Sequence, residues 1–175
     1  SPTWISSVSV LQIAIGIHCM RCNIREMYCV KVKSRFFNKQ LIKIRSWIEK
    51  IKNIGYKVKL DTNGSSPAVL QKLLSMGLVD YIAMDVKASL DSYEKVAGAK
   101  INKENLRKSI QVIKNSGIEY EFRTTMIPDI MGDYEIKQIA ILIKDAKKYF
   151  IQQFRSDDKT IDKKYNSMKA LRRKD

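Results

Sequence analysis

The sequence lacks the features that mark membrane-spanning and secreted proteins. No apolar run reaches the roughly 20 residues that a membrane-spanning helix needs. The apolar opening segment, residues 1–17, has no basic stretch before it, which argues against a signal peptide. The chain has only three cysteines, an odd number confined to one short stretch, so a disulfide framework is not expected. These absences predict a cytoplasmic protein with no membrane partner.

Acidic residues are also scarce, since 33 lysines and arginines face 18 aspartates and glutamates, for a formal net charge of +15. A field of this sign can attract nucleic acid or acidic partners. The lysines, however, are spread along polar helix faces such as residues 40–55, and no arginine-rich stripe alternates with aromatic residues. We therefore interpret the charge as solvated lysine and do not expect a nucleic-acid partner.

The order of hydrophobic patterns predicts an α/β fold. Helix-like segments with apolar residues on one face alternate with short β-branched segments, which is typical of right-handed βαβ units and a mostly parallel sheet of about five strands. The expected strands are 8–17, 56–61, 81–86, 118–127 and 148–154, and the expected helices are 38–54, 66–76, 90–97, 103–116 and 133–143. We expect one domain, residues 1–155, and a charged tail, residues 156–175.

Single residues refine the expected helices. Ser66, Asn102 and Asp133 are placed to cap helix starts, because their short polar side chains can accept hydrogen bonds from free backbone N–H groups. Gly55 and Gly77 stand where helices end. Trp47 and Met76 fall on helix faces and are expected in the core.

Polar side chains gather where the expected strands end. Asp61 and Thr62 close one strand, Asp85 and Lys87 close the next, and Arg123 lies late in the fourth. Ligands of parallel α/β sheets bind at the carboxyl ends of the strands. These residues are therefore candidate ligand-binding residues at one edge, where the cysteine segment after the first strand is expected to join them.

The segment "HCMRCNIREMYCV", residues 18–30, holds all three cysteines and the single histidine. Cys19, Cys22 and Cys29 favour thiolate ligation of a metal or an iron–sulfur cluster. His18 could complete a zinc site with them, which would make the chain a small zinc-binding module, although the spacing is irregular for zinc. The other interpretation of His18 is an ordinary residue at a strand end.

Three longer stretches resemble one family. They are "KVKLDTNGSSPAVLQKLLSMGLVDYIAMDVKASLDSYEKVAG", "SIQVIKNSGIEYEFRTTMIPDI" and "FIQQFR". They are similar to the radical SAM activating enzymes, and within them to the activating proteins of anaerobic ribonucleoside-triphosphate reductase. The resemblance runs from about residue 38 to 155 and implies a partial β/α barrel.

The resemblance also implies cofactors, partners and site residues. The cofactors would be a 4Fe–4S cluster and S-adenosylmethionine, which together yield a 5′-deoxyadenosyl radical. That radical would take a hydrogen from a glycine of an anaerobic ribonucleotide reductase, with flavodoxin or ferredoxin as electron donor. Asp61, Thr62 and Asp85 would surround a monovalent cation beside the cofactor, with Lys87 nearby. Arg123 would reach the cofactor carboxylate.

The chain departs from this family in two places. The family's loop is similar to "CNxRCPYC", and here Cys22 and Cys29 match its first and third cysteines while Glu26 stands at the middle one. A carboxylate is a poorer ligand than thiolate for such a cluster, so Cys19 becomes the candidate third ligand. The family's "GGEP" segment corresponds to residues 35–38, which read Arg-Phe-Phe-Asn. We therefore expect a barrel shortened between residues 30 and 37, and a catalytically inactive, degenerate homologue is the alternative function.

Overall fold

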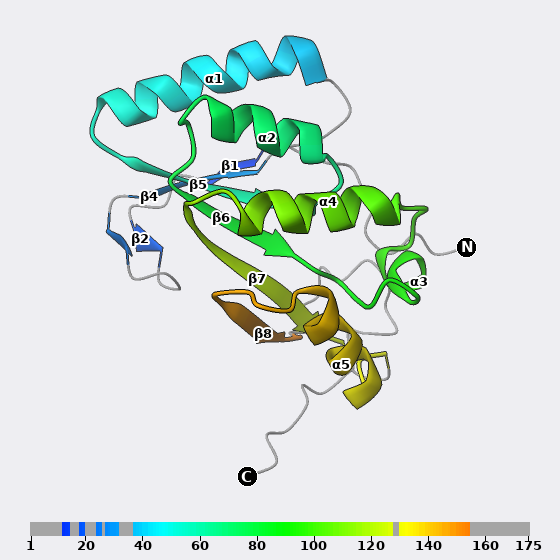
Figure 1. Cartoon of the computed structure of the whole chain (residues 1–175). Helices are drawn as coiled ribbons and strands as arrows, with labels where there is room; N and C mark the ends of the chain where they lie inside the picture. Colours follow the sequence, from blue (N-terminus) through cyan, green and yellow to red (C-terminus); the bar gives the residue numbers. More distant parts are fainter. Residues whose placement is uncertain are drawn as a thin grey trace, which may run out of the picture.

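The computed structural model describes residues 12–14, 18–19, 24–25, 27–31, 37–127 and 130–154, with side chains from residue 45 onward (Figure 1). The predicted tail, residues 156–175, lies outside these ranges. The strands are β1 Gln12–Ala14, β2 His18–Cys19, β3 Ile24–Arg25, β4 Met27–Lys31, β5 Lys57–Thr62, β6 Tyr81–Asp85, β7 Glu119–Met126 and β8 Tyr149–Gln153. The helices are α1 Phe37–Asn53, α2 Pro67–Ser75, α3 Tyr93–Ala97, α4 Lys103–Lys114 and α5 Asp133–Leu142.

The main sheet confirms the expected α/β class with a mostly parallel sheet. Its strand order is β1-β4-β5-β6-β7-β8, and every pair from β4 to β8 is parallel. Because β5, β6, β7 and β8 follow one another in both sequence and space, each connection is a crossover that carries at least one helix. The arrangement is compatible with a shortened partial β/α barrel.

The first strand differs from the expectation. β1 is short and runs antiparallel to β4, with Gln12 opposite Lys31 and Ala14 opposite Cys29. β1 therefore runs against the parallel strands, and the expectation that it belongs to the parallel part of the sheet was wrong. The placement of the cysteine segment at the same edge as Asp61 and Asp85 stays a prediction, because this segment lies partly outside the described residues.

The cysteine segment also contains strands that were not expected. Residues 18–30 were interpreted as a loop because of their potential ligands, yet β2 and β3 pair with each other and β4 is inserted between β1 and β5. The physical signal was present in "MYCVK", a short run whose tyrosine and valine favour extended backbone. Neighbouring strands supply hydrogen-bond partners on both sides of β4, which outweighs the weak local preference of so short a segment.

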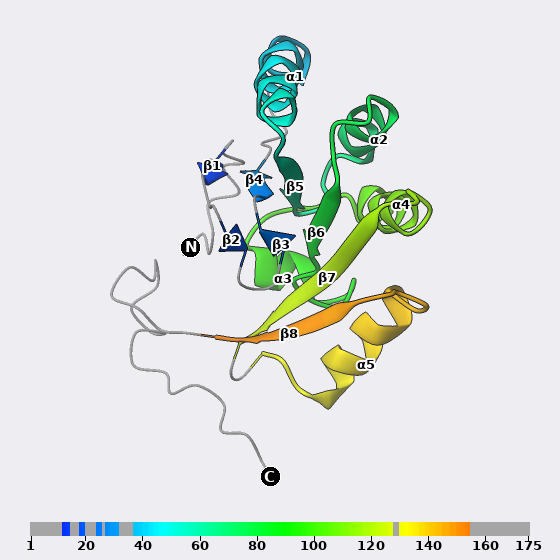
Figure 2. The ribbon, with the colours of Figure 1, turned by 90° about the vertical axis from the view of Figure 1, so that its left-hand side faces the viewer.

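Helices cover one face of the sheet. Figure 2 shows α1, α2, α4 and α5 on the outer side of the curved sheet, while the other side faces β2 and β3. Alternate residues of each strand point into the helical layer, where Leu60, Ile82 and Phe122 are almost fully buried against helix residues such as Leu73 and Ile110. Within the described residues, no helix has the length and apolar character needed to cross a membrane.

The helix ends follow local sequence signals, with some corrections. The Asn102 side chain accepts a hydrogen bond from the backbone N–H of Asn105, as expected of a cap. Ser66 occupies the cap position of α2 but forms no such side-chain bond. Asp133 is the first residue of α5 and Gly132 is its cap, so the predicted capping role of Asp133 was wrong.

One predicted core residue is exposed. The Trp47 side chain lies on α1 with 56% of its surface accessible, whereas Ile48 beside it is buried. A helix turns 100° per residue, so only one of two neighbours can face the sheet. Met76, the other predicted core residue, is partly buried and packs against the core.

Candidate active site

Charged side chains line the face of the sheet that the helices leave uncovered. The strand register places Asp61 beside Ala83, Ala83 beside Glu121, and Asp85 beside Arg123. Because side chains alternate between the two faces of a strand, Asp61, Asp85, Glu121 and Arg123 all fall on the same face, opposite the apolar core. Two separate apolar–polar alternations, "KVKLD" in β5 and "EYEFR" in β7, create this face.

Arg123 joins three carboxylates, which come from β5, β6 and β7. Its Nε atom donates to Oδ1 of Asp85 at 2.8 Å. Its Nη1 atom lies 3.3 Å from Oδ1 of Asp61 and 3.7 Å from Oε1 of Glu121. The structure thus brings together three of the five cofactor-binding residues predicted from the sequence, namely Asp61, Asp85 and Arg123.

The carboxylates stabilise the charge of this arginine. Burial of the Arg123 guanidinium opposes its positive charge, but Asp85 and Asp61 outweigh this effect and raise its pKa above the ordinary value. The Asp85 side chain is half exposed, while those of Arg123 and Asp61 are largely buried. The cluster therefore opens to solvent at Asp85, and a ligand would approach it from that side.

Behind this cluster lies a buried ion pair that sequence reasoning missed. Lys59 Nζ lies 3.0 Å from Glu121 Oε1, and the Tyr81 hydroxyl donates to Glu121 Oε2 at 2.8 Å. Only 1% of the Glu121 side chain is exposed. The pair could have been predicted from the apolar–polar alternation of β5 and β7, which places Lys59 and Glu121 on the same face of the sheet.

Lys87, another predicted site residue, follows β6 in a half-buried position. Burial lowers the pKa of its ammonium group below the ordinary value, and the nearby Asp85 partly opposes this effect. Tyr93 packs beside the same segment, and its hydroxyl donates to the backbone carbonyl of Asp85 at 3.4 Å. Burial raises the pKa of Tyr93 to about 12, so its hydroxyl remains a proton donor at neutral pH.

A buried carboxylate holds the segment after Lys87 in place. Glu135 of α5 accepts hydrogen bonds from the Ser89 N–H at 2.9 Å, from the Ser89 hydroxyl at 3.1 Å and from the Ser92 hydroxyl at 2.6 Å. Burial opposes ionisation of Glu135, but these hydrogen bonds outweigh it and lower its pKa below the ordinary 4.5. Glu135 thus fixes the loop from Lys87 to Ser92 against α5.

Thr62 is not brought into the charged cluster. Its hydroxyl accepts a hydrogen bond from the Gly64 N–H at 3.1 Å, and its side chain lines a small hollow beside α2. Residues 61 and 62 are neighbours on one strand, so their side chains leave on opposite faces. The role of Thr62 beside a cation stays a prediction from the resemblance.

The predicted metal ligands are described only in part. Cys22 lies outside the described residues, and Cys19 and Cys29 are described in their backbone alone. Cys29 lies inside β4 beside Lys59, two residues before Lys31, which lies beside Asp61. Cys19 belongs to β2, which Figures 1 and 2 place near the end where the parallel strands begin. Within the described side chains, no group of three or more His, Cys, Asp or Glu residues could hold a metal ion.

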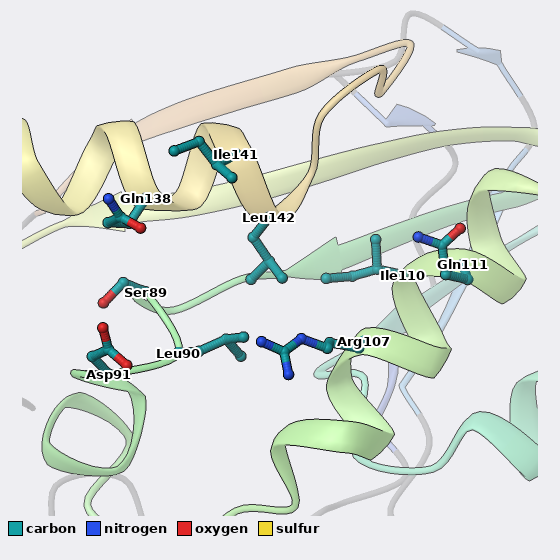
Figure 3. Close-up of a pocket in the computed structure, with 9 residues that line it drawn as sticks. All are labelled: Ser89, Leu90, Asp91, Arg107, Ile110, Gln111, Gln138, Ile141 and Leu142. Atoms are coloured by element: carbon teal, nitrogen blue, oxygen red, sulfur yellow. The ribbon is translucent and has the colours of Figure 1, made fainter.

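Two hollows of similar size lie on different faces. One, of about 500 Å³, is lined by Glu121, Arg123 and Thr125 of β7 and by residues 150–153 of β8, directly beside the charged cluster. The other, also of about 500 Å³, lies between α4, α5 and residues 89–91. Figure 3 shows Arg107 pointing from α4 toward Leu90 in this second hollow, with Gln111 and Gln138 on separate helices. Only the first hollow adjoins the charged cluster.

The chain is thus an α/β protein with a cluster of charged side chains on the uncovered face of its parallel sheet. No protein-family model matches the chain. Over 111 residues the chain is 37% identical to a protein of Methanocaldococcus jannaschii described as a candidate glycyl-radical enzyme activating enzyme. The matched part covers 61% of this chain and 46% of that protein, so it spans less than half of the relative's length.

Proposed function

We propose that this chain acts as a radical SAM activating enzyme and that Asp61, Asp85, Lys87 and Arg123 bind S-adenosylmethionine. The observation that carries the proposal is the convergence of Asp61 and Asp85, near the carboxyl ends of β5 and β6, on Arg123 of the adjacent parallel strand β7. The similarity to the glycyl-radical activating protein of Methanocaldococcus jannaschii supports the same class. The proposed protein substrate is a glycine of an anaerobic ribonucleotide reductase, with flavodoxin or ferredoxin as electron donor.

The residues of the cluster fit the charges of S-adenosylmethionine. This cofactor carries a carboxylate together with a positive ammonium and a positive sulfonium group. The planar fork of Arg123 suits a carboxylate, and Asp61 and Asp85 suit positive groups or a monovalent cation. Counting Lys59, Lys87 and Arg123 against Asp61, Asp85 and Glu121, three positive and three negative charges cancel. The site therefore offers charges of both signs to a ligand that itself carries both.

The fit of a 4Fe–4S cluster rests on the cysteines. Cys19, Cys22 and Cys29 have the donor chemistry that such a cluster needs, and we propose them as its ligands. When bound, the cluster would supply the electron that cleaves the cofactor. The described backbone places β2, and with it Cys19, near the opposite end of the sheet from Asp61 and Asp85. Ligation by Cys19 of a cluster beside Asp61 and Asp85 would therefore require β2 to lie elsewhere than it does here.

Anaerobic reconstitution of the full chain with iron and sulfide tests the proposal. We expect iron and acid-labile sulfide to co-purify with the protein, and S-adenosylmethionine to yield 5′-deoxyadenosine after chemical reduction. Mixing with an anaerobic ribonucleotide reductase should then produce a glycyl radical signal in electron paramagnetic resonance. Protein that binds neither iron nor S-adenosylmethionine would refute the proposal.

The second candidate is a catalytically inactive homologue that keeps the binding site. It is favoured by Glu26 at the middle cysteine position and by the inclusion of Cys29 in β4. In that case S-adenosylmethionine binds in equilibrium dialysis, but no 5′-deoxyadenosine forms, and replacing Glu26 by cysteine does not restore cleavage. Metal analysis after aerobic purification separates both candidates from a zinc-binding module, which would retain one zinc per chain.

A further inference from the structure

The carboxylate of Glu121 in β7 is held by groups on the two neighbouring strands β5 and β6. Lys59 of β5 lies 3.0 Å from its Oε1 atom, and Tyr81 of β6 donates to its Oε2 atom at 2.8 Å. Lys59 Nζ also lies 5.0 Å from the centroid of the Tyr81 ring, a cation–π distance. Both carboxylate oxygens are therefore fixed, and rotation of this side chain would break at least one of these contacts.

This set of polar groups is not the most stable way to fill a protein interior. Lys59 and Glu121 are 3% and 1% exposed, and burying two charges costs more free energy than packing apolar side chains of similar size. The opposite face of the same strands is built from such apolar residues, for example Leu60 and Phe122. The presence of the pair thus calls for a role other than stability.

The contact that connects this pair to the candidate site is made by Arg123. Arg123 stands two residues after Glu121 on the same face of β7, and its Nη1 atom is 3.7 Å from Glu121 Oε1. Without the Glu121 carboxylate, one contact that fixes the plane of the guanidinium is lost, and the group can rotate out of the orientation in which Nε donates to Asp85. Lys59 would also lose its contact with Glu121, and it could then compete for Asp61, which follows it on the same face of β5.

We propose that Glu121 is a positioning residue for Arg123. The contacts from Lys59 and Tyr81 hold the Glu121 carboxylate in one orientation. The carboxylate in turn fixes the orientation in which the Arg123 guanidinium contacts Asp61 and Asp85. The consequence for ligand binding rests on the proposed function. Arg123 binds the carboxylate of S-adenosylmethionine through two hydrogen bonds only if its guanidinium group is already oriented toward it. In this proposal Glu121 acts through Arg123 and has no contact of its own with the cofactor.

The orientation of Arg123 can be measured in the ligand-free protein. The Nε–H group that donates to Asp85 should give a protected signal in nuclear magnetic resonance, which Arg123→Lys identifies by its loss. In Glu121→Gln we expect solvent exchange of this N–H to accelerate by about tenfold or more, because the charged contact that restrains Nη1 is removed. The matched control is Glu119→Gln on the same strand, where the exposed pair with Lys148 is lost and exchange should stay unchanged.

A triple variant separates positioning from simple stability. Replacing Lys59 by Met, Tyr81 by Phe and Glu121 by Met removes every polar group of the set at once, so the fold should be as stable as the original. A positioning role predicts that solvent exchange of the Arg123 Nε–H in the triple variant is nevertheless as fast as in Glu121→Gln. If the signal remains protected in Glu121→Gln, or returns in the triple variant, the proposal is wrong.

Equilibrium dialysis with S-adenosylmethionine distinguishes failure of this proposal from failure of the proposed function. We expect Glu121→Gln to weaken binding by about tenfold, while Glu119→Gln leaves binding unchanged. If the original chain does not bind the cofactor, the proposed function fails, but the exchange experiment still decides the role of Glu121. If the original chain binds and Glu121→Gln binds equally well, the positioning role fails and the proposed function stands.

Discussion

Asp85 and Arg123 are direct neighbours across β6 and β7, and the Nε atom of Arg123 donates to Oδ1 of Asp85 at 2.8 Å. The pair stands at the carboxyl end of β6, where Asp85 is the half-exposed member. Asp61 reaches the same guanidinium from β5. A ligand that enters at Asp85 therefore meets a cation held by two aspartates, and it can exchange its own charged groups for theirs.

Arg123→Lys should weaken binding of S-adenosylmethionine by about tenfold to a hundredfold, a loss of roughly 1.4–3 kcal/mol. Lysine keeps the positive charge but not the planar fork that binds a carboxylate through two hydrogen bonds. Equilibrium dialysis measures the affinity, and circular dichroism verifies the fold. The control is Arg107→Lys on α4, which should bind normally. Unchanged affinity in Arg123→Lys would remove this arginine from the site.

Lys87→Met should stabilise the ligand-free protein and weaken cofactor binding. Burial lowers the pKa of Lys87 in the folded state below its ordinary 10.5, so keeping this lysine charged on folding costs free energy. That cost is present at neutral pH and disappears as the pH rises through the lowered pKa toward 10.5. Urea unfolding of both proteins at several pH values should show the stability gain of the variant shrinking with rising pH. A gain that is constant with pH would contradict the interpretation.

Glu135→Gln should destabilise the protein by about 1–3 kcal/mol at pH 7, because a charged acceptor of three hydrogen bonds is lost. The folded-state pKa of Glu135 lies below 4.5, so its stabilisation is present above pH 4.5 and disappears as the pH falls through the lowered value. The two proteins should therefore become equally stable in acid. Glu104→Gln, which removes an exposed contact of 3.8 Å to Lys108, should change stability little at any pH.

Gly64→Ala should be more destabilising than Gly55→Ala, although both glycines have positive φ angles, +73° and +89°. At either position, holding alanine in the left-handed backbone conformation costs roughly 1–2 kcal/mol of stability. At Gly64 the added methyl group also overlaps the buried end of Met84 and approaches Leu106, whereas at Gly55 it meets open space. Overpacking should add about 1–3 kcal/mol at Gly64 alone. Equal losses in thermal unfolding would show that Met84 can move aside.

The sequence predicted the helices and the later strands well because their signals are local. Residues 103–114 have an apolar face and a capping Asn102, and the structure has α4 there with its cap bonded. Trp47 was misplaced because hydrophobicity alone does not fix on which side of a helix a residue lies. Asp133 was misplaced by one residue, since the backbone of Gly132 begins the helix without a side-chain cap.

The grouping of the candidate site residues was predicted in part, while their role in binding stays a prediction. Asp61, Asp85 and Arg123 were expected together because the strands that carry them are clear in the sequence. The antiparallel direction of β1 and the strand at Cys29 were missed, since strand partners distant in sequence decide both. The pairing of Lys59 with Glu121 was missed for the same reason, because 62 positions separate these residues along the chain.

The two-faced construction of β5 and β7 has a consequence for how the chain tolerates change. Deleting one residue in the middle of β7 would swing Phe122 toward the charged side and drive a glutamate into the aliphatic layer under the helices. Length variation in this protein should therefore be confined to connections such as residues 98–102. Along β5 and β7, the strand register is therefore constrained as strictly as the types of residue at each position.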